Sequence, residues 1–290
     1  MKRHATTLSS VLALAGALSA ALVALPASAS AEKAAAGAAS AAAVSPAAID
    51  VPALYAQHCA ACHAPNRLGA MGPALLPDNL GRLRKSEAAK VIAEGRAATQ
   101  MAGFAAQMSK EEIAALTEWI YSPVVPAPRW TDDDIRASRI VHVDPATLSD
   151  KPVFDADPMN LFLVVEAGDH HVSVLDGDKL EPIFRFQSRF ALHGGPKFAA
   201  EGRYVFFASR DGWITKFDLW NLKVVAEVRA GINTRNVAAS PDGTHVAVAN
   251  YLPNTLVLLD GDLNLVKTIE AKDRDGKKSS RVSAVYDATP

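Results

Sequence analysis

The sequence predicts two domains of different class, a small all-α domain followed by an all-β domain built as a β-propeller. Apolar residues recur with helical spacing up to residue 122. Prolines gather at 123–128, and beyond residue 153 strand-like runs return at a fixed interval. The 290 residues suffice for two modest domains. With 30 basic and 31 acidic side chains the formal net charge is −1, which argues against nucleic acid as a partner.

The first 29 residues have the pattern of a secretory signal peptide. Lys2 and Arg3 precede an apolar run over 11–25, and small residues at 27–29 form a cleavage site. The alternative is a membrane anchor that stays attached, but the apolar run is too short to span a bilayer comfortably. We therefore expect export to the periplasm. Residues 30–48 are mostly Ala, Ser and Gly, which predicts a flexible tether.

Residues 49–122 are predicted to form the helical domain. Ser86 is expected to cap a helix that ends at Gly95. Ser109 and Glu112 have the spacing of a capping box at the start of a second helix. The apolar stripe of that second helix consists of Ile113, Leu116 and Ile120.

The strongest chemical signal in the helical domain is the run Cys59-Ala-Ala-Cys62-His63. Two thiols one helical turn apart can both bond to one haem, and the adjacent histidine is then directed at its iron. A thioredoxin-type redox pair or half of a zinc site would not explain the histidine, and no second cysteine pair exists. We therefore predict one covalent haem c on Cys59 and Cys62, with His63 as an iron ligand.

Three methionines are candidates for the sixth iron ligand. Met71 lies close to the attachment site, and Met108 directly precedes the expected helix cap. Met101 lies in the loop between the two helices, an arrangement that resembles the methionine loop of small class I cytochromes c. That resemblance implies Met101 as the ligand, and Gly72-Pro73 as the pair whose neighbouring carbonyl holds His63. A thioether ligand raises the reduction potential and favours electron transfer over oxygen binding.

Residues 123–152 are predicted to be a stiff proline-rich linker, of which 130–152 suggest no element. Beyond them, Asp176, Asp218 and Asp260 each end an apolar run and recur at intervals of 42 residues. A second strand follows each, and a repeat of about forty residues with four short strands is typical of a propeller blade. Coincidentally regular hairpins of a sandwich are the alternative.

Residues 153–290 account for about three blades, whereas propellers close with about four to eight. We expect an incomplete propeller, either because the remainder is missing or because a partner completes it. The run 281–287 looks like a strand of the next blade.

Four stretches of the second domain carry a family resemblance. They are Arg-Phe-Ala-Leu-His-Gly-Gly-Pro-Lys-Phe at 189–198, Ser-Arg-Asp-Gly-Trp at 209–213, Lys-Phe-Asp-Leu-Trp at 216–220 and Gly-Ile-Asn-Thr-Arg-Asn at 231–236. Here the chain resembles the haem d1 family, which includes cytochrome cd1 nitrite reductase and a relative that acts in haem d1 biosynthesis.

The resemblance implies an eight-bladed propeller that holds haem d1, with His193 as the proximal iron ligand. Arg210 and Arg235 would lie near the ring carboxylates, which suit guanidinium donors. The weaker candidates are Arg189, Tyr251 and Arg281. His170 and His171 are expected to be an exposed pair in a turn.

Residues 166–177 and 220–228 look closer to the biosynthetic branch of the family. This resemblance implies oxidation of a dihydro-haem d1 propionate to an acrylate, with electrons passed through haem c to an external redox partner. The catalytic base stays unassigned. Two alternatives are a nitrite reductase that forms nitric oxide, and a truncated electron-transfer cytochrome without catalysis.

Overall fold

The computed structural model describes residues 48–287. The predicted signal peptide and all but the last residue of the predicted tether lie outside the described residues. Within the described part, no helix is long and apolar enough to cross a membrane.

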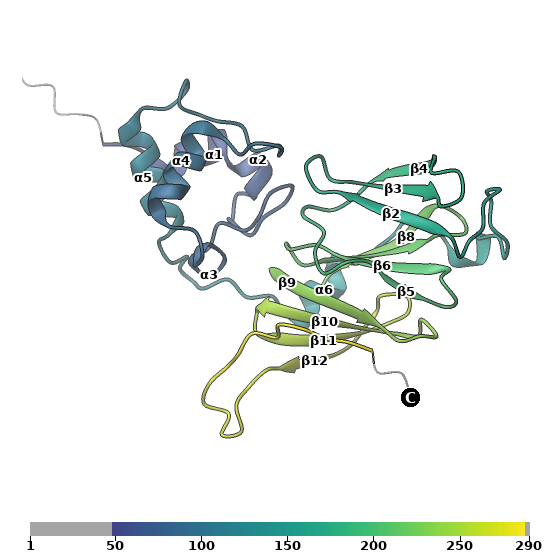
Figure 1. Ribbon diagram of the computed structural model, residues 1–290. Coiled ribbons are helices and arrows are strands. Elements are labelled where there is room, and N and C mark those ends of the chain that lie inside the picture. The colour runs from purple at the N-terminus through teal and green to yellow at the C-terminus, as the bar shows by residue number, and fades with distance from the viewer. Residues whose placement is uncertain (1–47, 288–290) are drawn as a thin grey trace, which may run out of the picture. The chain divides into compact units, whose positions relative to one another are not determined.

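The first part of the structure is a small group of helices, as the sequence predicts (Figure 1). The helices are α1 (Val51–His58), α2 (Ala60–His63), α3 (Pro77–Leu80), α4 (Lys85–Glu94) and α5 (Lys110–Ile120). Their shared core contains Tyr55, Ile92, Met108 and Leu116, all at most 7% exposed. The core residues of α5 are the predicted stripe, because helical spacing places them on one face.

Helix boundaries follow the local signals in two of three cases. Ser109 accepts from the Glu112 backbone and Glu112 bonds back to Ser109, so the predicted capping box is confirmed. Gly95 ends α4 as predicted. The predicted cap at Ser86 is wrong, since α4 begins one residue earlier and its N-cap Arg84 makes no side-chain capping bond.

The segment that suggested no element is partly ordered. Helix α6 (Asp132–Ser138) begins at a capping box between Thr131 and Asp134. Strand β1 (Ile140–Val141) and a 3₁₀ turn at Pro145–Thr147 follow. Because β1 pairs with the edge of a later sheet, this segment is part of the β domain's architecture.

Three antiparallel sheets make up the second part. The first consists of β2 (Leu161–Glu166), β3 (His171–Asp176) and β4 (Pro182–Gln187). The second consists of β5 (Lys197–Ala199), β6 (Tyr204–Ala208), β7 (Trp213–Asp218) and β8 (Lys223–Arg229), with β1 added beside β8. The third consists of β9 (Asn233–Ala239), β10 (His245–Leu252), β11 (Thr255–Asp260) and β12 (Leu265–Glu270). Apart from β1, the strands of each sheet form a meander in which sequential strands are neighbours, as in propeller blades (Figure 1).

The 42-residue repeat has a structural cause at its aspartates. Asp176 accepts from the backbone N–H groups of 178 and 179, Asp218 from that of 221, and Asp260 from those of 262 and 264. Each carboxylate thus closes the turn into the next strand of its sheet. The repeat is therefore a recurring turn device at the end of β3, β7 and β11.

The middle sheet is buried on both faces. Val205 and Phe207 of β6 pack toward the first sheet, and Phe206 and Ala208 pack toward the third. This alternation follows from the two-residue period of a strand. Phe217 of β7 stacks on an aromatic ring of β4 at 4.3 Å between ring centroids, which joins the first two sheets.

The end of the described chain differs from the prediction. Residues 281–287 form no strand, although the Val282 N–H donates to Asn250 O at 3.1 Å.

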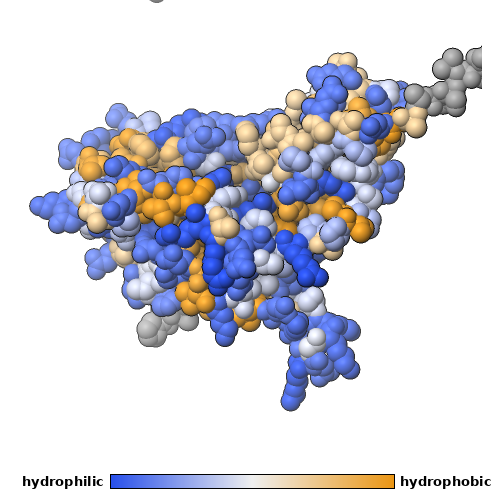
Figure 2. Space-filling view, turned by 180° about the vertical axis from the view of Figure 1, so that it is seen from behind, coloured by the Kyte–Doolittle hydropathy of each residue, from blue (hydrophilic) through white to orange (hydrophobic). Residues whose placement is uncertain are grey.

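Apolar surface is visible as separate patches among polar side chains (Figure 2). Among exposed apolar residues, Phe162 and Val164 alternate along β2 with side chains that enter the core.

Candidate functional site

The cysteine-histidine run lies where two short helices meet. Cys59 is both the C-cap of α1 and the N-cap of α2, and the His63 N–H donates to Cys59 O at 2.9 Å. Cys59 is buried and Cys62 exposed, and neither is in a disulfide. Burial, and then the neighbouring Cys62, raises the pKa of the Cys59 thiol to about 11. Both thiols are thus unpaired one helical turn apart, as the spacing predicts.

The His63 ring is buried and held in one orientation. Its Nδ1 donates to Pro73 O at 2.8 Å, which leaves the Nε2 lone pair for a metal. The predicted role of the Gly72-Pro73 pair is therefore seen in the structure. A Cβ on Gly72 would come within 2.8 Å of the ring, so only glycine leaves room for it. Burial lowers the pKa of His63, which favours the neutral imidazole that ligates metals.

The three methionines differ in environment. Met108 is 5% exposed and belongs to the helical core, and Met71 is 52% exposed. Met101 is half-buried in the loop after α4, where its carbonyl accepts from Arg96 N–H at 2.9 Å. Gly95 allows this loop to close, because a Cβ there would lie 2.6 Å from Met101 O. Met101 is therefore the methionine that is neither a core filler nor a mostly exposed side chain.

These residues fit a covalent haem c. The unpaired thiols would form the thioether bonds, His63 Nε2 would be one axial ligand, and Met101 is the candidate for the other.

Three predicted residues of the β domain are brought together by backbone hydrogen bonds. The Arg210 N–H donates to Ala191 O at 3.2 Å, in the loop that carries His193. The Thr234 N–H donates to Arg210 O at 3.3 Å, one residue before Arg235. The His193 N–H donates to a β6 carbonyl at 2.7 Å. His193, Arg210 and Arg235 therefore come from three segments but belong to one main-chain network.

The His193 ring contacts Arg235 at both nitrogens. Nδ1 donates to the Arg235 carbonyl at 3.2 Å, and Nε2 accepts from the guanidinium. Burial, followed by the positive charges of Arg235 and Arg210, lowers the pKa of His193. A neutral imidazole with an Nε2 lone pair beside two guanidinium groups fits an iron tetrapyrrole that carries carboxylates.

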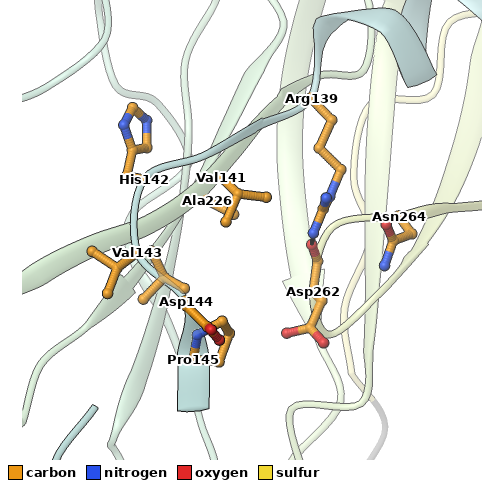
Figure 3. A pocket seen from close by; sticks show the side chains of 10 residues that line it. Arg139, Val141, His142, Val143, Asp144, Pro145, Ala226, Asp262 and Asn264 are labelled. Atoms are coloured by element: carbon orange, nitrogen blue, oxygen red, sulfur yellow. Dashed lines mark hydrogen bonds between the residues drawn. The ribbon is translucent and has the colours of Figure 1, made fainter. Parts of the chain in front are cut away.

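Two cavities of the β domain are candidates for this site. One of about 150 Å³ is lined by His193, Leu192, Pro196 and Phe207, with apolar walls and one imidazole. The other, of about 340 Å³, lies beside β1 (Figure 3). Its Arg139 donates to Asp262 O, and the carboxylate of Asp262 pairs with Lys216 at 2.8 Å. We take the smaller cavity as the candidate site because it holds the predicted ligand.

The weaker candidates are mostly engaged elsewhere. Arg189 forms a two-pronged ion pair with Glu227 and stacks on Trp213 at 3.8 Å. Burial disfavours the Glu227 carboxylate, but the hydrogen bond and charge of Arg189 outweigh it and lower the pKa of Glu227. Arg281 lies 5.3 Å over the ring of Tyr251. The pKa of Tyr251 is lowered, first by a hydrogen bond with a serine and then by nearby arginines.

The expectation of an exposed histidine pair in a turn is wrong, because neither side chain is exposed and His171 is the first residue of β3. His170 is only 8% exposed and packs edge-on against Phe190, while His171 is half-buried and contacts Asp169. One residue was missed altogether: Asp211, beside Arg210, is 1% exposed. Its Ser-x-Asp-Gly context predicts a turn but does not reveal burial.

The two parts of the chain match two different families of known proteins, a cytochrome c family and a haem d1 domain family. Residues 156–290 match the family described as "Cytochrome D1 heme domain". Residues 46–120 match "Cytochrome C oxidase, cbb3-type, subunit III".

Particular relatives are similar over both parts. The chain is 59% identical to the dihydro-heme d1 dehydrogenase of Pseudomonas aeruginosa over 239 residues, 82% of this chain and 48% of that protein. A solved structure of dihydro-heme d1 dehydrogenase NirN in complex with DHE matches with a TM-score of 0.75 at 59% identity, over 81% of this chain and 51% of that one. A nitrite reductase of Stutzerimonas stutzeri is 27% identical over 243 residues, 76% of this chain and 42% of that protein. The predicted resemblance to the haem d1 family is confirmed, and the chain spans about half the length, or less, of these relatives.

Proposed function

We propose that this chain provides the haem c and the haem d1-binding part of a periplasmic dihydro-haem d1 dehydrogenase. The carrying observation is the network that joins His193, Arg210 and Arg235 in a chain 59% identical to such an enzyme. Cys59, Cys62, His63 and Met101 would hold the haem c. The periplasmic location rests on the predicted signal peptide, which lies outside the described residues.

At the second site the residues have separate tasks. His193 would offer Nε2 to the iron of haem d1 or its dihydro precursor, and the hydrogen bond from Nδ1 to Arg235 O keeps the ring in that tautomer. A guanidinium and an iron cannot share one lone pair. An iron held by Nε2 would therefore displace the Arg235 guanidinium, which would then be available, with that of Arg210, to hold a ring carboxylate.

The reaction removes two hydrogens from a propionate side chain and leaves an acrylate, which releases two protons and two electrons. A bound c-type haem supplies one-electron transfer, so two transfers to an external redox partner are needed for each product. No described residue is assigned as the base that takes the protons.

The test begins with the holoprotein, titrated with dihydro-haem d1 and followed by absorbance. Binding in the wild type, loss of binding in Arg210→Gln/Arg235→Gln and loss of the iron-histidine spectral signature in His193→Ala are expected. With an electron acceptor added, conversion to haem d1 is measured by mass, a loss of two hydrogens.

Other outcomes decide between the alternatives. Sustained nitric oxide formation from nitrite and a reductant would favour the reductase. If the purified protein reduces and reoxidises its haem c but binds no dihydro-haem d1, the non-catalytic electron carrier is the better description.

A further inference from the structure

The turn between β6 and β7 contains a buried carboxyl group that the proposed function does not use. Asp211 follows Arg210, and its side chain is enclosed by protein. Its Oδ1 accepts from the Ser209 hydroxyl, while Oδ2 has no hydrogen-bond partner among the described residues. A buried oxygen without a partner carries a desolvation cost, which asks for an explanation.

The backbone around Asp211 is fixed by several independent contacts. Ser209 N–H donates to Trp213 O at 2.8 Å, and Trp213 N–H donates to the Ser209 hydroxyl at 3.2 Å. Gly212 has a φ of +97°, and a Cβ there would lie 1.8 Å from Gly231 O. Arg229 Nε donates to Asp211 O at 2.8 Å. These contacts hold the backbone of the turn in one conformation, in which the Asp211 side chain is buried and Arg210 is exposed.

A second turn of the chain has the same motif in a different setting. Ser240 and Asp242 repeat the Ser-x-Asp-Gly pattern, with a hydroxyl-to-carboxylate bond of 2.6 Å. Asp242 is exposed, and its hydrogen bonds to Ser240 and Thr244 lower its pKa to about 2. The motif alone therefore accounts for the local bond, but not for the burial of Asp211.

Arg210 links this turn to the rest of the site through its main chain, to the His193 loop on one side and to the Arg235 strand on the other. We infer that the buried Asp211 carboxyl is a positioning residue, which fixes the Arg210 turn against His193 and Arg235 and sets the strength with which Arg210 holds an anionic ligand. This assignment rests on the proposed function for the identity of the ligand, a tetrapyrrole carboxylate.

The charge of Asp211 provides a measurable signature. The charged groups around it are Arg229 of β8, Arg189 before β5 and the adjacent Arg210. Burial raises the pKa of Asp211 to about 6, against the Ser209 hydrogen bond and the charges of Arg229 and Arg189. Above that pH the carboxylate offsets part of the positive charge that attracts an anion. Anionic ligands should therefore bind more weakly to the ionised form, by about fivefold.

Two substitutions separate position from charge. Asp211→Asn keeps an acceptor for Ser209 but cannot ionise, so it should match the wild type at pH 5 and bind dihydro-haem d1 about fivefold more tightly at pH 7.5. Asp211→Ala removes the anchor and should bind more weakly at both pH values. The matched controls Asp242→Asn and Asp242→Ala should change neither affinity.

A second readout needs no ligand. The Nε–Hε NMR resonance of Arg210, assigned with Arg210→Lys, should shift with pH through about 6 in the wild type and not in Asp211→Asn. Equal pH profiles of this resonance in both proteins would overturn the inference, even if Asp211→Ala does not fold. Absence of dihydro-haem d1 binding in the wild type would instead overturn the proposed function, and the resonance would still decide the role of Asp211.

Discussion

Met101 and Met108 lie seven residues apart, yet their side chains have different tasks. Met101→Ala should abolish the sulfur-to-iron charge-transfer band of the oxidised protein, because the loop side chain is the candidate ligand. Met108→Ala should keep that band and lower the free energy of unfolding by about 2–5 kcal/mol, since it empties a core position. An unchanged band in Met101→Ala would remove this residue from the haem c site.

Asp211 should also give the protein's stability a pH dependence of unusual sign. Its folded-state pKa of about 6 lies above the ordinary value of 3.8, so between these values the folded state binds more protons than the unfolded state. Stability therefore falls as pH rises through this window, by at most about 3 kcal/mol, and the loss is complete above pH 6.

Urea unfolding of wild type and Asp211→Asn at pH 4 and pH 7.5 measures this effect. The variant should gain stability relative to the wild type as pH rises. Asp242→Asn should show the opposite pH dependence and lose stability relative to the wild type as pH rises. The pKa of Asp242 is lowered, so its stabilising contribution is present at neutral pH and lost on acidification. If the difference in unfolding free energy between Asp211→Asn and the wild type is the same at both pH values, folding does not raise the pKa of Asp211.

At the scale of elements, the glycines of two turns should differ in how much stability is lost when they are replaced by alanine. Gly212→Ala must accommodate a positive φ and a collision with Gly231 O, and should cost about 3 kcal/mol or more. Gly243→Ala has a positive φ but its nearest contact is an alanine Cβ at 3.4 Å, so about 1 kcal/mol is expected. Thermal unfolding of both variants compares them, and equal losses would contradict the close approach at Gly231.

Elements defined by short-range signals could be predicted from the sequence. Ser109 and Glu112 are three residues apart and satisfy each other, so their capping box needs nothing else from the fold. Thr131 and Asp134 make the same device, but the helix behind them is only seven residues long, too short to show a periodicity. At Ser86 the sequence offered a good capping residue that the structure does not use, because α4 already begins one residue before it.

The residues of the candidate site could be proposed from the sequence, whereas their contacts could not. The family resemblance singled out His193, Arg210 and Arg235, and the structure places all three in one network. The burial of Asp211 and His170 depends on segments far away in sequence, such as Arg229 for the first and Phe190 for the second. Turn patterns describe only local backbone, so neither could be seen from the sequence.

For the whole β domain, stability should depend most on the middle sheet, which packs on both neighbours. Phe217→Ala should cost about 3–5 kcal/mol, because its ring is fully buried and stacked between two sheets. Phe162→Ala, at a residue of β2 that is 53% exposed, should change stability by about 0.5 kcal/mol or less. Urea unfolding followed by the circular dichroism of the β-sheets measures the unfolding free energy of both variants. Similar losses of stability would contradict the assignment of the core.

The bonds that join the three site segments are almost all made by main-chain groups. They use N–H and C=O groups, so proline at 210 or 234 would remove a donor. Ala191 and Thr234 are restricted in other ways, since Ala191 has a φ of +38° and the hydroxyl of the buried Thr234 donates to Asn250 at 2.6 Å. The main-chain framework can therefore stay in place when Arg210 or Arg235 is replaced by another residue that has a backbone N–H group.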